Sequence, residues 1–243
     1  MIAIFKKEFL LFTKNKIGLL TVCFFLILYS VILFTNLFGL NILDKGYADY
    51  STFFNLSPII YLIFTPAIAM RSFSEEYKND TIDILFSKPI SKLNIILGKF
   101  LSIYFIVFLS IIPTFIYPIS IYFLGESIGN LDIGAIIGSY IGLLFLCLLF
   151  SAISIFSSSL SSNQLNSFII AVFFNLSFYY GFDVLSQLFD SGKISILIQK
   201  IGIIKHYELL SKGLISSSDI IYFISSSSFF IILCHLQIEK KIR

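Results

Sequence analysis

The stretch Arg71–Lys99, RSFSEEYKNDTIDILFSKPISKLNIILGK, is the long charged segment around which the rest of the chain is arranged. It contains five of the chain's 17 basic residues and four acidic residues, and a strongly apolar segment lies on each side of it. In an otherwise lipid-soluble chain, a polar segment of this length is expected to face water and to contact another molecule.

The composition excludes a soluble globular domain. Hydrophobic residues make up 57% of the 243 residues and charged residues 13%, with a mean hydropathy of +0.94, whereas soluble domains carry about 25% charged residues. The basic residues are dispersed over short loops and form no stripe, so no nucleic-acid partner is expected. The three cysteines lie in apolar runs without metal-ligand spacing, and we expect no metal and no other cofactor.

The apolar pattern predicts an all-α polytopic membrane protein with a single transmembrane domain over residues 1–243. Residues 1–16 are expected to form an amphipathic helix at the membrane surface, because aromatic residues recur on one helical face and lysines lie off it. A cytosolic extension of the first span is the alternative. A six-span bundle over 17–238 and a tail at 239–243 follow. Each span approaches the ~20 residues that cross ~30 Å of hydrocarbon, and the six are expected at 17–38, 57–73, 100–124, 133–156, 165–189 and 219–238.

The distribution of basic residues predicts the orientation. Twelve of the 17 lie on the side that holds both termini and Arg71–Lys99. Basic residues favour the cytoplasmic side of a membrane, so a multi-pass protein with both termini in the cytoplasm is expected. The apolar segment 190–218 then lies outside, as a short helix on or dipping into the interface. A weak extra span is the alternative, which the basic C-terminal tail argues against.

The second and third spans each contain two prolines, Pro58 and Pro66 in the one and Pro113 and Pro118 in the other. Proline kinks a helix and frees a backbone carbonyl, which neighbouring helices or water can satisfy. Kinked helices suit a pathway that opens and closes, so Pro66, Pro113 and Pro118 are candidate gating residues. Proline is also common in membrane helices without such a role.

Capping signals predict a short helix over Thr81–Lys88. Asp80 can start it by accepting a hydrogen bond from an exposed backbone N–H. Asp83 suits the positive end of the helix dipole, and Pro89 ends the helix, because the residue before proline avoids the helical region.

This predicted helix has an apolar face made of Ile82, Leu85 and Phe86. The face either packs against its own chain or docks into a groove on a partner protein, and the residues alone favour neither. Ser91 can cap the next helix, which continues into the third span.

The chain contains no P-loop. Its Gly98-Lys99 pair lacks the required earlier glycine, because Leu93 occupies that position. Any ATP hydrolysis must therefore come from another polypeptide. An enzyme is not expected either, since both histidines fall near membrane boundaries. Asp183, near the outer end of the fifth span, is explained more simply by contact with water than by the functional role that an acid inside a membrane otherwise indicates. We expect no catalytic residues.

The charged stretch also carries a run of the form E-E-x-x-x-x-T-x-x-x-L-x-S-x-P-I, ending in G-K. This run resembles the integral-membrane subunits of ABC-2 type exporters. The start IAIFKKEF, the segment Asp49–Lys99 and the segment His206–Phe223 are similar to the permease of the gliding-motility-associated ABC transporter. Asp80 stands where the family usually has glycine, and Ser216 where it often has an acid. The matching residues are Glu75, Glu76, Thr81, Leu85, Ser87, Pro89, Ile90, Gly98 and Lys99.

The resemblance implies a permease subunit of an exporter-like complex in the bacterial inner membrane, coupled to ATP hydrolysis by a separate ABC ATP-binding subunit. Residues 1–16 would be its elbow helix and Thr81–Lys88 its coupling helix. The implied partners are the ATP-binding subunit, membrane lipids and a second permease subunit, a related protein in preference to a second copy. An ATPase-coupled scaffold or motor that moves no solute, or a secondary carrier or channel, is the alternative. The docking residues that the resemblance implies are Glu75, Glu76, Asp80, Thr81, Asp83, Ile84, Leu85, Ser87 and Pro89.

Overall fold

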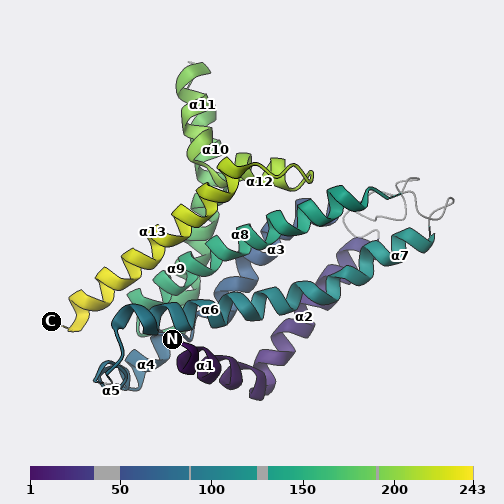
Figure 1. The fold of residues 1–243 in the computed structure, drawn as a ribbon. Helices are drawn as coiled ribbons and strands as arrows, with labels where there is room; N and C mark the ends of the chain where they lie inside the picture. The colour runs from purple at the N-terminus through teal and green to yellow at the C-terminus, as the bar shows by residue number, and fades with distance from the viewer. Residues whose placement is uncertain (36–49, 88, 125–130, 190–191, 243) are drawn as a thin grey trace.

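The computed structural model describes residues 1–35, 50–87, 89–124, 131–189 and 192–242, and these residues form helices and short connections without any strand (Figure 1). This confirms the predicted all-α class. The helices are α1 (Ile2–Lys14), α2 (Lys16–Phe34), α3 (Ser51–Ala69), α4 (Ser74–Lys78), α5 (Ile82–Phe86), α6 (Lys92–Ile111), η3 (Ile112–Phe115), α7 (Ile116–Leu124), α8 (Ile133–Leu160), α9 (Gln164–Leu176), η4 (Ser177–Gly181), α10 (Phe182–Gln187), α11 (Gly192–Ile201), α12 (Ile203–Leu210) and α13 (Ser217–Ile242).

Five helical stretches among the described residues are long and apolar enough to cross a membrane, and a sixth follows if α1 and α2 are counted together across their 70° bend. The 19 residues of α2 rise about 28 Å, close to the ~30 Å of hydrocarbon. The expected polytopic helical fold is therefore present, although residues 36–38 of the first expected span lie outside the described residues. The five stretches run over 51–78, 92–123, 133–160, 164–187 and 217–241.

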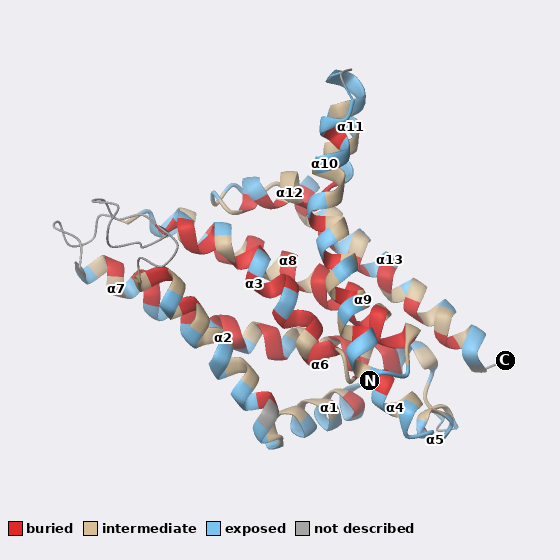
Figure 2. Cartoon of the chain, turned by 180° about the vertical axis from the view of Figure 1, so that it is seen from behind, coloured by how far each residue is buried: buried red, intermediate tan, exposed pale blue. Residues whose placement is uncertain are grey.

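α8 forms the centre of the bundle and contacts α3, α6, α9, α12 and α13. Burial is highest along α3, α6 and α8, whereas α9 and α13 keep much of their surface exposed (Figure 2). One end of the bundle carries α1, α4, α5 and the C-terminal end of α13, so both termini lie at that end (Figure 1).

The spans expected at 133–156 and 165–189 leave residues 157–164 as a connection outside the membrane helices, but more than half of this interval is helical. α8 continues to Leu160, and Ser157, Ser158 and Ser159 are fully buried. Ser157 Oγ donates to the Ile153 carbonyl at 2.9 Å, a contact by which a serine satisfies its hydroxyl without leaving the helix. A run of serines can therefore remain helical in an apolar bundle.

α12 packs against α8 at one end of the bundle, whereas α11 projects away from the bundle and has no buried residue (Figure 1). Tyr207 of α12 donates its hydroxyl to the Phe54 carbonyl at 2.8 Å, and burial raises the pKa of Tyr207, which keeps it a neutral donor. Gly213 follows at φ +79, and a Cβ there would lie 2.5 Å from the Ala135 Cα. With ten and eight residues, α11 and α12 are too short for the alternative of an extra span.

The Phe54 carbonyl is the one that Pro58 frees, because a proline removes the N–H that would reach the carbonyl four residues before it. By the same rule Pro66 frees the Leu62 carbonyl, which accepts a hydrogen bond from the buried Asn175 amide of α9 at 3.5 Å. The predicted satisfaction of proline-freed carbonyls by neighbouring helices is thus confirmed at two positions in α3.

The third span is one helical stretch that changes to a 3-10 turn at the first of its two prolines. Pro113 lies in the 3-10 turn η3 between α6 and α7, and Pro118 of α7 frees the Thr114 carbonyl. That carbonyl accepts from the Tyr140 hydroxyl at 3.2 Å and the Tyr50 hydroxyl at 3.4 Å. The freed carbonyls are therefore paired with side chains from α12, from α9 and from the buried tyrosines.

Candidate functional site

The charged stretch contains two short helices, α4 and α5, joined by a turn at Asp80, and ends in the first turns of α6. Asp80 has φ +53, in the left-handed region. The Thr81 N–H donates to the Glu76 carbonyl at 3.0 Å, and the Asp80 N–H donates to the Tyr77 carbonyl at 3.4 Å. This pair of bonds is the Schellman motif that ends a helix with a residue at positive φ, most often glycine.

The predicted role of Asp80 as the start of the next helix is therefore wrong. Asp80 ends α4, and α5 begins after Thr81 without a side-chain cap. Aspartate is favoured at helix starts and also tolerates the left-handed region, so its residue type did not distinguish the two positions. The glycine that the resembling family carries here suits the observed conformation, because glycine adopts positive φ without steric penalty.

α5 is shorter than the expected Thr81–Lys88 and covers Ile82–Phe86. Asp83 lies in its first turn, as predicted, whereas Lys88 lies outside the described residues. The Ser91 hydroxyl accepts from the Asn94 N–H at 3.4 Å, which confirms Ser91 as the cap of α6.

The inner face of α5 packs against its own chain. Leu85 is buried in a small apolar cluster with Ile4 of α1 and Ile95 of α6. Ile82 and Phe86, the other predicted members of the apolar face, are partly buried against the core. The outer face is different: Ile84 is 64% exposed, and Asp83 and Ser87 are exposed beside it. α5 therefore packs one face against its own bundle and carries an exposed apolar residue, Ile84, on the other face.

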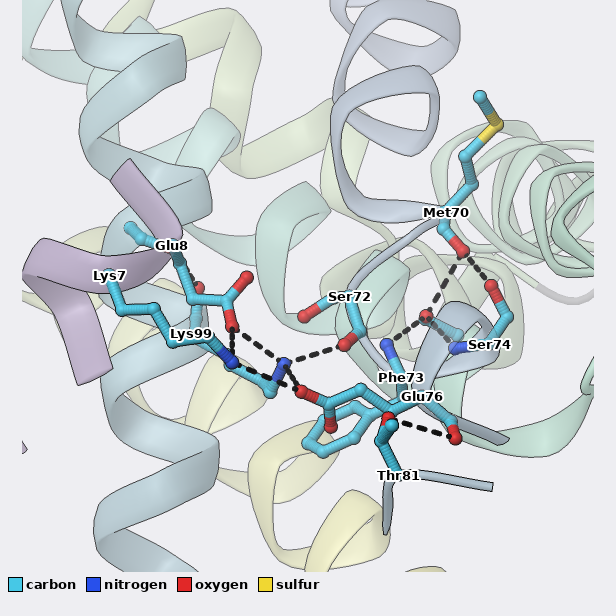
Figure 3. Close-up of polar contacts among 11 residues, drawn as sticks. Lys7, Glu8, Met70, Ser72, Phe73, Ser74, Glu76, Thr81 and Lys99 are labelled. Carbon is cyan, nitrogen blue, oxygen red and sulfur yellow. Dashed lines mark hydrogen bonds and ion pairs between the residues drawn. The ribbon is translucent and has the colours of Figure 1, made fainter. Parts of the chain in front are cut away.

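A buried ion cluster joins this segment to the bundle (Figure 3). Lys99 Nζ of α6 donates to Glu8 Oε1 of α1 and to Glu76 Oε1 of α4, each at 2.9 Å. It also donates to the Ser72 carbonyl at 2.7 Å, and lies 5.1 Å from the centre of the Phe73 ring. We call Lys99, Glu8 and Glu76 the ion cluster.

The Lys99 side chain is 1% exposed, whereas Glu8 is 18% and Glu76 13% exposed. A buried ammonium is stable only when its three protons find acceptors, and the two carboxylates and the carbonyl supply one each. Lys7 lies at the rim, 3.8 Å from Glu76 Oε1 and largely exposed, where an ion pair contributes little. The ion cluster therefore holds α1, α4 and α6 in one arrangement.

α1 also packs directly on α6. A Cβ at Gly98 would lie 3.0 Å from the Met1 carbonyl oxygen and from the Ile4 Cβ, so glycine allows the two helices to approach. Phe5 and Phe9 of α1 contact the Phe105 ring edge-on, with centroids 5.6 and 5.5 Å away. These contacts position Glu8 over Lys99.

Two further residues hold α4 from the far side. The Ser158 hydroxyl of α8 accepts from the Phe73 N–H at 3.0 Å and the Ser74 N–H at 3.3 Å, which satisfies free donors at the start of α4. Near the end of α13, Lys241 lies 3.8 Å from the Tyr77 ring centre and donates to the Ser159 carbonyl at 2.9 Å. The segment is thus fixed to α1, α6, α8 and α13.

The structure brings only some of the expected docking residues together. Glu76 and Leu85 face inward, and Thr81 donates weakly to the Glu76 carbonyl at 3.4 Å. The other expected docking residues are all exposed: Glu75, Asp80, Asp83, Ile84, Ser87 and Pro89. The gating candidates lie within the spans and not beside these residues: Pro66 in α3, Pro113 in η3 and Pro118 in α7.

Lys99, Glu8, Ser158 and Lys241 were not assigned site roles from the sequence. Lys99 carried a signal that could have found it, because a lysine at the border of an apolar span, here expected from residue 100, needs a partner if it is buried. Ser158 carried none, since nothing local distinguishes one serine of a run from another. Among the described residues, no group of three histidine, cysteine or acidic side chains could hold a metal ion.

Comparison with protein families gives a match that covers most of the chain. The profile described as ABC-2 family transporter protein matches residues 41–235. Lys99 and Glu76 fall within the matched residues, whereas α1, with Glu8, lies before them. No curated protein matches the chain.

Proposed function

The chain belongs to the ABC-2 family of transporter proteins, and on that premise we propose that it is the permease subunit of an exporter-like complex driven by a separate ATP-binding subunit. The observation that carries this proposal is the two-faced α5: Leu85 anchors it to the bundle while Ile84 is 64% exposed. A short helix with a free apolar residue among exposed polar ones suits a groove on a partner protein.

The contacts of the α4–α5 segment give a route for motion. A displacement of α5 acts on α1 and α6 through Leu85, and on the same helices through Glu76 and the ion cluster. It also acts on α8 through the bonds of Ser158 to the start of α4. Because packed interiors transmit strain and deform little, movement of the docked helix moves the inner ends of the spans.

The orientation belongs to the same proposal. Both termini and the α4–α5 segment are assigned to the cytoplasm on the positive-inside rule, which makes the segment accessible to a cytoplasmic ATPase. The membrane is a bacterial inner membrane in this assignment. The finer assignment, a gliding-motility-associated complex with a second, related permease subunit, is supported by the resemblance of the first hundred residues and of His206–Phe223.

The test uses the tagged permease, purified from the membranes of its native host. We expect a P-loop ATPase to co-purify with the permease, and we expect the resulting complex to hydrolyse ATP. Ile84→Asp should lose both the ATPase and the activity, because a charge replaces the apolar contact. Ile215→Asp, which changes a similarly exposed isoleucine (47% exposed) at the opposite end of the bundle, should keep both.

Equal ATPase retention by the two variants would refute docking through α5. Absence of any ATPase from the unsubstituted protein would instead favour a secondary carrier or channel. ATP-dependent flux in vesicles reconstituted with the complex separates a transporter from a scaffold that uses ATP without moving solute.

A further inference from the structure

A cavity of about 420 Å³ lies beside the ion cluster, between α1, the end of α3 and the first half of α6. Its volume falls in the range of about 300–1,000 Å³ that small-ligand sites occupy. Ile84 and Asp83, on the outer face of α5, do not line it, whereas three other docking residues do: Glu75, Glu76 and Thr81.

The cavity is amphipathic. One part of its wall is apolar and comes from α1 and from the spans: Leu11, Phe12, Ile68, Ile103 and Ile106. The other part carries charges of both signs from Lys7, Glu8, Arg71, Glu75, Glu76 and Lys99. A ligand that fits such a wall needs an apolar portion together with a charged one.

Two charged side chains of this wall have unused hydrogen-bonding capacity. Arg71, at the end of the second span, forms no ion pair with any residue in the described part of the chain. Glu75 of α4 is exposed, lines the cavity and forms no ion pair with any described residue. The wall therefore offers one unpaired cation and one unpaired anion, which suits a ligand that carries charges of both signs.

We propose that this cavity binds the headgroup of an aminophospholipid of the phosphatidylethanolamine type. The guanidinium of Arg71 is suited to hydrogen-bond the phosphate in a bidentate manner, and the primary ammonium donates to the Glu75 carboxylate. Leu11 and Phe12 of α1 and Ile103 and Ile106 of α6 line the path of an acyl chain.

The position of the cavity favours a lipid over a soluble ligand. α1 is the amphipathic helix expected at the membrane surface, and the cavity lies beneath it at the inner ends of two spans. A soluble phosphate compound would leave the apolar part of the wall in contact with water, whereas a phospholipid covers it. This inference does not depend on whether α5 docks to an ATPase.

The experiment is native mass spectrometry of the purified permease, delipidated and then titrated with single lipids. We expect phosphatidylethanolamine to be retained more strongly than phosphatidylglycerol, which lacks the cation, and phosphatidylcholine, whose methylated nitrogen donates no hydrogen bond. Arg71→Gln should weaken retention of phosphatidylethanolamine at least about tenfold, because the bidentate contact with the phosphate is lost and each charged hydrogen bond contributes about that factor. Lys78→Gln is the matched control, because Lys78 is exposed on α4 and does not line the cavity.

A second variant protects the test against misfolding of the first. Ala67→Phe places a ring in the cavity without removing a charge and should lower retention as well, while the melting temperature stays near that of the unsubstituted permease. Equal retention of the three lipids, or equal retention by Arg71→Gln and Lys78→Gln, overturns the proposal. Displacement of the lipid by free phosphoethanolamine at equal concentration overturns it too, because the acyl chain then contributes nothing.

Discussion

Replacing Lys99 with methionine should destabilise the protein by about 3–5 kcal/mol, the usual cost of removing one partner from a buried ion pair. Methionine fills similar space and adapts to irregular packing, so the change isolates the charge. The Lys99 side chain is 1% exposed and two carboxylate oxygens lie 2.9 Å from its nitrogen. Without it, Glu8 and Glu76 repel each other and lose their buried donor.

The decisive comparison is with a triple variant, Lys99→Met with Glu8→Gln and Glu76→Gln. Removing all three charges leaves no buried ion without a partner, and replacing a buried ion network by neutral residues is often nearly neutral for stability. We therefore expect the triple variant to recover most of the loss, to within about 1 kcal/mol of the unsubstituted protein.

Thermal unfolding in detergent measures the effect. The chain has no tryptophan, so a thiol-reactive dye is the probe, with Cys147 and Cys234 buried and the exposed Cys23 replaced by serine in all variants. A loss of 3–5 kcal/mol corresponds to a fall of roughly 6–20 °C for a chain of this size. A fall below about 3 °C in Lys99→Met, or a triple variant as unstable as the single one, would refute the structural role of the ion cluster.

Two further predictions concern backbone groups. Asp80→Gly should leave the stability unchanged or raise it, whereas Asp80→Ala should cost about 1 kcal/mol, because an ordinary side chain at positive φ is strained. Equal melting temperatures of the two variants would contradict the left-handed conformation of Asp80 at φ +53. Tyr207→Phe should cost about 1–3 kcal/mol by leaving the buried Phe54 carbonyl without its donor. The loss should shrink in Tyr207→Phe with Pro58→Ala, because alanine restores the N–H that reaches this carbonyl, and chemical denaturation of all four proteins in the cycle checks this.

The features predicted correctly from the sequence are those set by local pattern and length. Runs of apolar residues close to twenty long predict spans whatever their neighbours are, and the described helices follow them. Ser91 and Asp83 were placed correctly because a cap and the first helical turn depend on residues three or four positions away. The apolar face of α5 was found for the same reason, from the helical spacing of Ile82, Leu85 and Phe86.

The errors arose where a residue type suits two environments. Aspartate serves both as a helix start and in the left-handed region, and Asp80 takes the second role. A run of serines predicts a loop exposed to water, yet Ser157 remains in a helix, since its hydroxyl donates a hydrogen bond to the carbonyl four residues earlier. In each case the surrounding bundle decides between two local states of similar energy.

The sequence by itself determined that Arg71–Lys99 is a polar segment between two spans, that it contains a short helix, and that the chain is helical throughout its membrane region. Only the tertiary structure decided which residues hold that segment in place. Lys99 forms hydrogen bonds with Glu8, which is 91 residues away in the sequence, and with Glu76, which is 23 residues away. The Phe54 carbonyl, freed by Pro58, accepts from Tyr207, which is 153 residues away. A buried charge or carbonyl requires a partner, but its chemistry does not say where in the chain that partner lies; only the packing of the helices does.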